Sequence, residues 1–543
     1  MPHDHADSTK RILTLGAVLG LSAAPTACFD AEPLPGDTEG GGTTGATGGT
    51  AGSTTTASST SSGTATGTGT GTSTSSGPGG DMGPGCMPGL TVCDGQCVDT
   101  NIDPMHCGDC GTACMPGDVC LSGSCEPDGV AAIEAGEAHT CALAKSGRVR
   151  CWGKNSAGQL GTGTGNNIGD DEKVADGTDV DLQGEKVVQL ALGKSHTCAL
   201  FDSGDVACWG ANTSKQLGFA GNGLTQPDFG KPVQNVSGAT AIFSGPGANH
   251  TCAVVPGGVK CWGANDAAQL GQMSTAPDGL APVMPLNLGG LEIWKVALGL
   301  RHTCALLEGG EVICWGTNDV GQLGSGDNPD PPDPPTVIGD NEFPQPAVPP
   351  GPFDMISAKA VDLCAGEVYN CAVLQDGNGD PTRVACWGRN TGGKLGYGPG
   401  VTFDDNLGDF EPASDGPVDP GVALASSENI VDLACGSQHT CVVFEDGAMQ
   451  CWGVNGEGQL GYGIGNENIG DNELANDKGP LEAPPALRSV GGYHRCMLTQ
   501  WGGVRCWGKN NRGQLGLGST KDYGVAPGEV PNALDDLVIF PPP

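Results

Sequence analysis

The chain has 543 residues, with 94 glycines, 40 prolines and only 5% aromatic residues, which favours turns and short strands over long helices. Its 62 acidic and 25 basic residues give a formal charge of −37. A surface this negative repels phosphate backbones and anionic lipid surfaces, so nucleic acid is excluded as a partner class. The 25 cysteines indicate an oxidising compartment, because a reducing cytosol would leave them as free thiols.

The N-terminal part predicts export. Two basic residues precede an apolar run at 12–24, so residues 1–27 form a signal peptide whose apolar run is too short to span a membrane. The small residues before Cys28 resemble the cleavage box of bacterial lipoproteins. We therefore expect lipidation of Cys28 and an outer-membrane or cell-surface location; ordinary secretion and an uncleaved anchor are the alternatives. Residues 28–85, rich in Gly, Thr and Ser, predict a disordered tether.

A small module with eight cysteines occupies residues 86–127. A segment this short needs covalent staples, and the sequence leaves the pairing of its disulfides open. A zinc site at Cys107 and Cys110 is the alternative, disfavoured by export. The run from Cys97 to Cys125, with His-Cys-Gly-Asp-Cys-Gly at its centre, resembles the stigma-specific cysteine-rich family, which implies an extracellular setting.

One short unit recurs seven times within residues 130–543. Each copy starts as a His-Thr-Cys-Ala-Leu type strand, turns at a glycine and returns as Cys-Trp-Gly. In the first copy, alternation on both sides of Ser146 predicts a hairpin that places the two cysteines directly opposite each other, where a disulfide is feasible. The predicted pairs are Cys141–Cys151, Cys198–Cys208, Cys252–Cys261, Cys304–Cys314, Cys371–Cys386, Cys441–Cys451 and Cys496–Cys506.

Two further cysteines, Cys364 and Cys435, lie outside the hairpins. They occupy near-equivalent strands of neighbouring copies, but they differ by one position in register. Such an offset would normally point the two side chains to opposite faces, so the sequence leaves their pairing open.

The turn after Trp-Gly completes the repeat, most clearly as Asn-Ser-Ala-Gly-Gln-Leu-Gly at 155–161. With His-Thr-Cys-Ala-Leu and the sevenfold repetition, this motif resembles the regulator-of-chromosome-condensation repeat family over about three quarters of the chain. The resemblance implies an all-β fold, a seven-bladed β-propeller with four-stranded blades. We expect the two ends of the repeat region, 130–133 and 529–539, to share one blade and so close the ring.

The most repeated side chains are expected to be structural. Six copies carry a histidine before the first cysteine, and we assign Asn370 to that position in the fifth copy. These blade histidines are expected to hydrogen-bond backbone groups, with a metal-binding ring as the alternative. The repeated tryptophan is expected to pack in the core or between blades. Trp294 and Trp501 lie outside the repeat register and are the candidates for a partner-facing aromatic surface.

Two acidic loops offer the oxygen ligands that calcium prefers. The first contains Asp170, Asp171 and Glu172, and the second contains Asp471 and Glu473. A solvated loop without a metal is the alternative reading for both.

The fifth hairpin carries an insert with Asp376, Asn378 and Asp380. Its spacing matches the opening of a calcium loop, but the glutamate expected at the twelfth position is missing. We interpret the insert as an elongated hairpin tip and as a candidate binding position.

The sequence contains no evident nucleophile elbow, phosphate loop or metalloprotease motif, so neither an enzymatic activity nor a cofactor is expected. The favoured function is a monomeric scaffold that binds an extracellular or periplasmic protein or glycan. An inhibitor of a secreted hydrolase is the first alternative, and an uncharacterised extracellular enzyme is the second. The family's nuclear members act on a small GTPase and bind chromatin, which does not carry over to an exported, acidic chain.

Overall fold

The computed structural model describes residues 86–541, apart from 87–88, 94–95, 116–117, 229–230, 273–277, 282–283, 325–336, 339–344, 347–358, 376–378, 400–405 and 408–421. The predicted signal peptide, the tether and Cys28 lie outside this part. Within it the fold is all β, with strands and three single-turn 3-10 helices, η1 (Val174–Asp176), η2 (Pro527–Glu529) and η3 (Pro531–Ala533). None of the helices in the described part is long and apolar enough to cross a membrane.

Seven small antiparallel sheets carry the repeats, and each begins with three consecutive strands that pair in chain order. The first strands are β5 (Val130–Ala135), β8 (Val187–Leu192), β11 (Ala241–Phe243), β15 (Ile293–Leu298), β20 (Ala360–Ala365), β24 (Ile430–Cys435) and β27 (Ala486–Gly491). The second strands are β6 (His139–Ala144), β9 (His196–Phe201), β12 (His250–Val255), β16 (His302–Leu307), β21 (Tyr369–Gln375), β25 (His439–Phe444) and β28 (His494–Thr499). The third strands are β7 (Val149–Gly153), β10 (Val206–Gly210), β13 (Gly258–Ala264), β17 (Val312–Thr317), β22 (Pro381–Arg389), β26 (Met449–Gly453) and β29 (Val504–Gly508).

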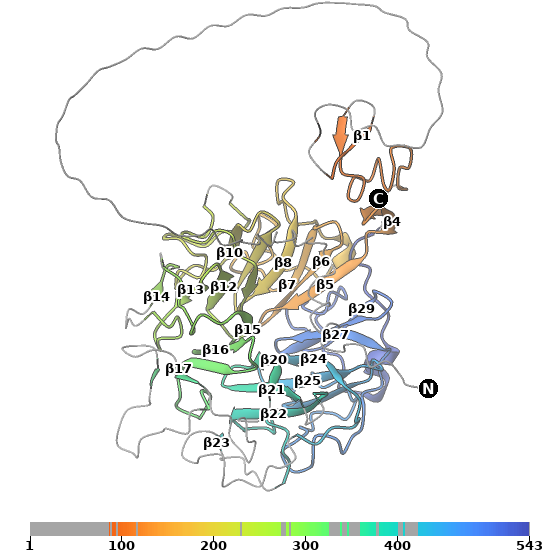
Figure 1. Cartoon of the computed structure of the whole chain (residues 1–543). Coiled ribbons are helices and arrows are strands. Elements are labelled where there is room, and N and C mark those ends of the chain that lie inside the picture. The colour runs from red at the N-terminus through yellow and green to blue at the C-terminus, as the bar shows by residue number, and fades with distance from the viewer. Residues whose placement is uncertain are drawn as a thin grey trace, which may run out of the picture.

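The seven sheets close into a ring. The first strand of each sheet contacts the first strand of the next, and the last of these contacts joins β27 back to β5. In Figure 1 the first strands gather about the centre of the ring, as the labels β5, β15, β20, β24 and β27 show. The first strands therefore surround the axis, and the other strands radiate outward, which is the architecture of a β-propeller.

The fourth strands are shorter than the resemblance implies. Three sheets have regular fourth strands of two residues, namely β14 (Asp278–Gly279), β18 (Val337–Ile338) with β19 (Gln345–Pro346), and β23 (Asn406–Leu407). In the other four sheets, the described residues form a single bridge at the glycine of Cys-Trp-Gly, as between Gly153 and Ile168. The chain turns sharply after Trp-Gly, and this turn leaves room for only a short ladder.

The C-terminal tail does not share the first blade, which corrects the expected closure. The first strand of the first sheet is β5, and it already precedes β6 and β7 in the chain. The tail completes the last sheet, where Leu537 N donates to Val504 O over 2.8 Å, as Val180 N does to Val149 O in the first sheet. Beyond it, Ile539 O accepts a bond from Arg150 of the first sheet over 2.6 Å. The tail therefore adds no strand to the first sheet but bridges the last sheet and the first.

The repeated tryptophan ties each sheet to the preceding repeat. Trp209 is fully buried, and its Nε1 donates to Gln159 O over 3.1 Å. The equivalent bonds run from Trp262 to Gln216, Trp315 to Gln269, Trp387 to Gln322, Trp452 to Lys394, Trp507 to Gln459 and Trp152 to Gln514. The last of these bonds joins the first sheet to the seventh, so one interaction repeats around the whole ring.

A second belt of hydrogen bonds uses the repeated histidines. His196 Nε2 lies 2.7 Å from Thr251 Oγ1 of the next repeat, and four other pairs repeat this contact: His139 with Thr197, His250 with Thr303, His302 with Asn370, and His494 with Thr140. Among the described residues, no three histidines bring ligand atoms within 4.8 Å of one another. The belt therefore joins sheets through side-chain oxygens of the neighbouring repeat, which corrects the expectation of bonds to backbone groups.

The fifth copy corrects one assignment made from the sequence. Tyr369, not Asn370, occupies the histidine position, since Tyr369 pairs with Gly388 as His139 pairs with Gly153. Asn370 takes the threonine position and accepts the bond from His302. The Tyr369 hydroxyl donates to His439 O over 2.7 Å, so the larger side chain still links two sheets.

Every cysteine in the described part of the chain forms a disulfide. Seven bonds join the second and third strands of the seven sheets, across pairs whose Cα atoms lie 4.0–4.1 Å apart. In the module, the bonds are Cys86–Cys97, Cys93–Cys110, Cys107–Cys120 and Cys114–Cys125. Because Cys107 and Cys110 are both oxidised, the alternative zinc site is not formed.

The remaining disulfide joins Cys364 to Cys435 across two neighbouring sheets, with Cα atoms 5.4 Å apart. The register offset is real, since Cys364 faces Cys371 whereas Ala434, not Cys435, faces Cys441. Adjacent sheets of a ring present opposite faces to each other. A bridge between first strands therefore needs side chains on opposite faces, and the one-residue offset supplies them.

Candidate binding surface

The two ends of the ring differ in chemistry. Turns between second and third strands, such as 145–147 and 500–503, lie at one end, which we call the hairpin face. Turns between first and second strands lie at the other end with the loops that follow Cys-Trp-Gly, and we call this end the loop face. Backbone bonds between neighbouring first turns, as from Leu300 N to Glu367 O, show that equivalent turns gather at the same end.

Exposed apolar side chains concentrate on the hairpin face. Among the described ring residues, the exposed large apolar side chains are Met284, Leu291, Trp294, Leu474, Leu487, Trp501 and Val538. Only Leu474 belongs to the loop face. Trp501 is 75% exposed at the tip of the last hairpin, and Trp294 is 37% exposed near the start of β15. Exposed aromatic side chains such as these are typical anchors of a surface that binds a partner.

Trp294 is one of six residues that occupy equivalent β-bulges on the first strands of their sheets. Register shifts on the first strands leave one residue per strand outside the ladder, as Trp294 stands between Ile293 and Lys295. We call these residues the apolar collar: Ala131, Val188, Trp294, Val361, Val431 and Leu487. The collar lies at the hairpin end of the strands that surround the axis. Trp294 and Leu487 are exposed there, whereas the three valines of the collar pack partly against the core between sheets.

Charged side chains follow the collar along the same strands. Lys295 Nζ lies 2.5 Å from Asp362 Oδ1, and Arg488 Nη2 lies 2.9 Å from Glu134 Oε1. Asp432 Oδ2 accepts a bond from the Ser489 N–H over 2.8 Å. We call Glu134, Lys295, Asp362, Asp432 and Arg488 the axial cluster. Two cations and three carboxylates leave it with one net negative charge.

The members of the axial cluster influence one another across the ring. Burial raises the pKa of Glu134, although the charges of Arg488 and Lys295 oppose this shift. Burial also raises the pKa of Asp432, against the lowering effect of Arg488. Solvent still reaches the cluster, since the side chains of Arg488 and Glu134 are 44% and 25% exposed. Both carboxylates therefore lie where an added positive charge would be favourable.

The axis is narrowed at the loop face by Glu367. The Tyr493 hydroxyl donates to Glu367 Oε1 over 2.8 Å, and Gln438 Nε2 donates to Oε2 over 3.3 Å. A Cβ added at Gly247 would lie 3.0 Å from Glu367 Cγ, so the third and fifth sheets meet here. Side chains from three sheets and the backbone of a fourth thus converge at this end, and access to the axial cluster is easier from the hairpin face.

The acidic loops lie on the loop face. The structure brings the carboxylates of Asp170, Asp171 and Glu172 within 4.8 Å of one another. The second loop brings no such trio together, and burial, followed by the charge of Asp471, raises the pKa of Glu473. In the first loop, Asp170 Oδ2 accepts a bond from an asparagine of the same loop over 2.9 Å. These carboxylates thus also hold their own loops in shape.

The hairpin insert is described only in part, since Asp376 and Asn378 lie outside the described residues. Asp380 directly precedes β22, so this end of the insert is at the hairpin face. Its position agrees with a hairpin tip.

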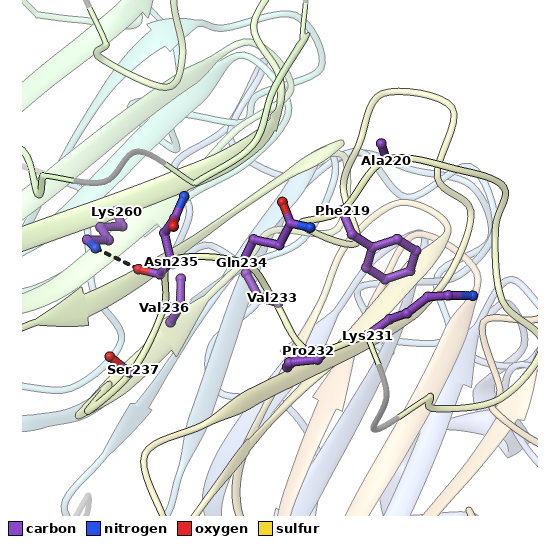
Figure 2. A pocket seen from close by; sticks show the side chains of 10 residues that line it. All are labelled: Phe219, Ala220, Lys231, Pro232, Val233, Gln234, Asn235, Val236, Ser237 and Lys260. Carbon is purple, nitrogen blue, oxygen red and sulfur yellow. Dashed lines mark hydrogen bonds between the residues drawn. The ribbon is translucent and has the colours of Figure 1, made fainter. Parts of the chain in front are cut away.

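A shallow outer groove of about 620 Å³ lies beside the third sheet (Figure 2). Lys260 Nζ donates to Asn235 O over 2.6 Å, and Lys231 forms a 3.3 Å ion pair with Asp228. Phe219, the aromatic side chain of the lining, is buried. The groove's cations are therefore engaged within the protein, and the hairpin face offers the stronger binding chemistry.

Family models match both parts of the described chain. Two models of the regulator of chromosome condensation (RCC1) repeat match residues 130–159, 187–216, 295–322 and 430–459, and residues 146–200 and 502–537. The propeller is built from RCC1 repeats. The Stigma-specific STIG1-like family model matches residues 67–128, which include the cysteine module.

Several known proteins are similar to this chain. The ultraviolet-B receptor UVR8 of Arabidopsis thaliana is 28% identical over 71% of this chain and 78% of its own length. The human probable E3 ubiquitin-protein ligase HERC6 is 28% identical over 51% of this chain, but the match spans only 24% of HERC6. The crystal structure of Prp20p from Saccharomyces cerevisiae superimposes with a TM-score of 0.52 at 20% identity, over 73% of this chain and 86% of Prp20p, and so shows the shared fold.

The axial cluster is the feature that sequence reasoning missed. The signal was present, because one register position of the RCC1 repeats reads Ala132, Gln189, Lys295, Asp362, Asp432 and Arg488 in six copies. A position that varies in charge while its neighbours repeat is under no common packing constraint. Aligning the first strands of the repeats would have revealed four members of the cluster, though not Glu134, which lies two residues beyond this position in β5.

Proposed function

We propose that this chain is an exported binding scaffold whose hairpin face takes up a partner protein, with the axial cluster at the centre of the contact. The observation that carries the proposal is the gathering of exposed apolar side chains, Trp294 and Trp501 among them, at the same end of the ring as an accessible charged centre. Interfaces typically combine aromatic anchors with a few charged groups in this way.

Two further observations support a protein partner. UVR8 is a receptor, and Prp20p has been described together with its binding to Gsp1p and histones. The cysteine module also borders the hairpin face, since Glu126 pairs with Lys145 over 2.7 Å and Asp128 bonds to Ser146 over 2.8 Å at the first hairpin (Figure 1). The module and the ring would thus present one continuous surface, on a chain held at the cell surface by lipidated Cys28.

The disulfides suit this role outside the cell. Each hairpin is crosslinked at its centre by a disulfide. Disulfides persist in the oxidising environment outside the cell, so they would hold the binding face in shape there. The described residues of this face supply apolar and charged contacts, which are the chemistry of a binding surface.

The test compares capture of extracellular proteins by three immobilised forms of the chain. Trp294→Ala combined with Trp501→Ala changes the hairpin face, and Leu474→Ala combined with Asp171→Asn changes the loop face. We expect the first variant to lose a partner that the unchanged chain retains, and the second to keep it. Loss from the loop-face variant alone would refute the proposal.

A further inference from the structure

The axial cluster carries an unbalanced charge. Lys295 is paired with Asp362 and Arg488 with Glu134, so both cations have a carboxylate partner. Asp432 accepts a backbone bond from Ser489, and no ion pair of Asp432 occurs among the described residues. The unmatched charge of the cluster is therefore negative.

The environment makes this charge a recognition element. Burial raises the pKa of Asp432 despite the opposing charge of Arg488 and the bond from the Ser489 N–H, so a further positive charge beside the carboxylate would favour its ionised form. An incoming anion would meet cations that already have partners, and it would add to the negative excess. Electrostatics thus select a cation over an anion at this position.

The collar above the cluster selects the shape of that cation. Trp294 and Leu487 are the most exposed members of the apolar collar, and each directly precedes a charged member of the cluster, Lys295 or Arg488. A ligand entering from the hairpin face would meet apolar side chains first and carboxylates second. Lysine and arginine have this order of chemistry, with an aliphatic stem and a charged end.

We propose that the axial cluster binds one basic side chain, the guanidinium or ammonium group of a partner protein, inserted from the hairpin face past Trp294. The proposal rests on the proposed function and names the chemistry of the partner. Entry from the other end is opposed by the contact of Glu367 with Tyr493 and Gln438. The cation completes the charge balance at Asp432, while its stem packs in the collar.

The test uses N-acetyl-arginine amide as the probe, titrated calorimetrically into the purified full chain at low salt. N-acetyl-citrulline amide has nearly the same shape without the charge, and we expect it to bind at least tenfold more weakly. Asp432→Asn should weaken binding of the arginine probe about tenfold. Asp171→Asn makes the same change in formal charge on the loop face, and it should leave the affinity unchanged.

Two results would overturn the inference. Equal binding of the two probes would show that charge is not recognised, and equal losses from Asp432→Asn and Asp171→Asn would show that only overall charge matters. Should Asp432→Asn fail to fold, Trp294→Ala replaces it, because this side chain is 37% exposed and its loss should reduce probe affinity about threefold to tenfold. An unchanged affinity in that variant would remove the collar from the site.

The inference can fail separately from the proposed function. If the partner is captured through the hairpin face but the arginine probe does not bind, the proposed function is supported and the proposed site for a basic side chain is refuted. If the probe binds at Asp432 and no partner depends on Trp294 or Trp501, the cation site is supported and the scaffold function is refuted.

Discussion

Acid should destabilise the propeller through its belt of buried histidines. Burial lowers the pKa of His302 to about 4, and the pKa of His250 to about 3. An unfolded histidine has a pKa of about 6.5, so the unfolded chain binds protons between pH 6.5 and the folded pKa while the folded chain does not. The stabilising effect of keeping each ring neutral is complete above pH 6.5 and is lost as the pH falls.

The expected size follows from the shift. Between pH 7 and pH 5, each such histidine should lower the free energy of unfolding by about 2 kcal/mol, from 1.36 kcal/mol per pKa unit. Carboxylates with raised pKa values, such as Asp432 and Glu134, act in the opposite direction, so the total change is not the sum over histidines. A single substitution isolates the effect.

His302→Gln should therefore reduce the loss of stability between pH 7 and pH 5 by about 2 kcal/mol relative to the unchanged chain. The measurement is guanidinium-induced unfolding at several pH values, followed by tryptophan fluorescence, since seven tryptophans are buried in the ring. His106→Gln, in the cysteine module, serves as the control for removing a histidine that lies outside the belt. A His302→Gln chain with the full acid loss would refute the assignment of that loss to the belt.

Three other changes test the fold and its anchoring. Replacing both Cys364 and Cys435 with serine opens a loop of 71 residues, which should lower the free energy of unfolding by about 4 kcal/mol by the chain-entropy relation. The denaturant midpoint should fall, and an unchanged midpoint would show that the disulfide does not stabilise the fold. Trp315→Phe removes the bond to Gln269 O and should lower stability by about 1 kcal/mol, which thermal melting would detect, and a change near zero would make that bond dispensable. Cys28→Ser should move the chain from the membrane to the soluble fraction, and continued membrane association would contradict lipidation.

Much of the fold was predictable because the same sequence unit, with the same hairpin pattern, recurs seven times. Symmetry about Ser146 gave the pairing of Cys141 with Cys151, and the structure pairs them in register. Contacts between sheets were harder, since they depend on how one sheet faces the next. The offset of Cys364 and Cys435 was therefore ambiguous in sequence, although the ring geometry makes that offset a requirement for bonding.

The candidate site was only half visible for a related reason. Trp294 and Trp501 stood out because they break the repeat, and both are exposed on the hairpin face. No sequence motif identified Lys295 or Arg488, because each is the single charged residue of its strand. Their meaning arises only when the ring places them beside Asp362 and Glu134 from neighbouring sheets.

The repeats are nearly uniform at the positions that join sheets and differ at the position near the axis. The tryptophan and histidine belts join every sheet to its neighbour, so a change at one of these positions alters a contact that closes the ring. The residue after the bulge lies near the axis, where it contacts a neighbouring sheet through a polar or charged group, as Lys295 contacts Asp362 and Gln189 contacts Ile242 O. The seven copies therefore differ at the axial position and resemble one another at the belts.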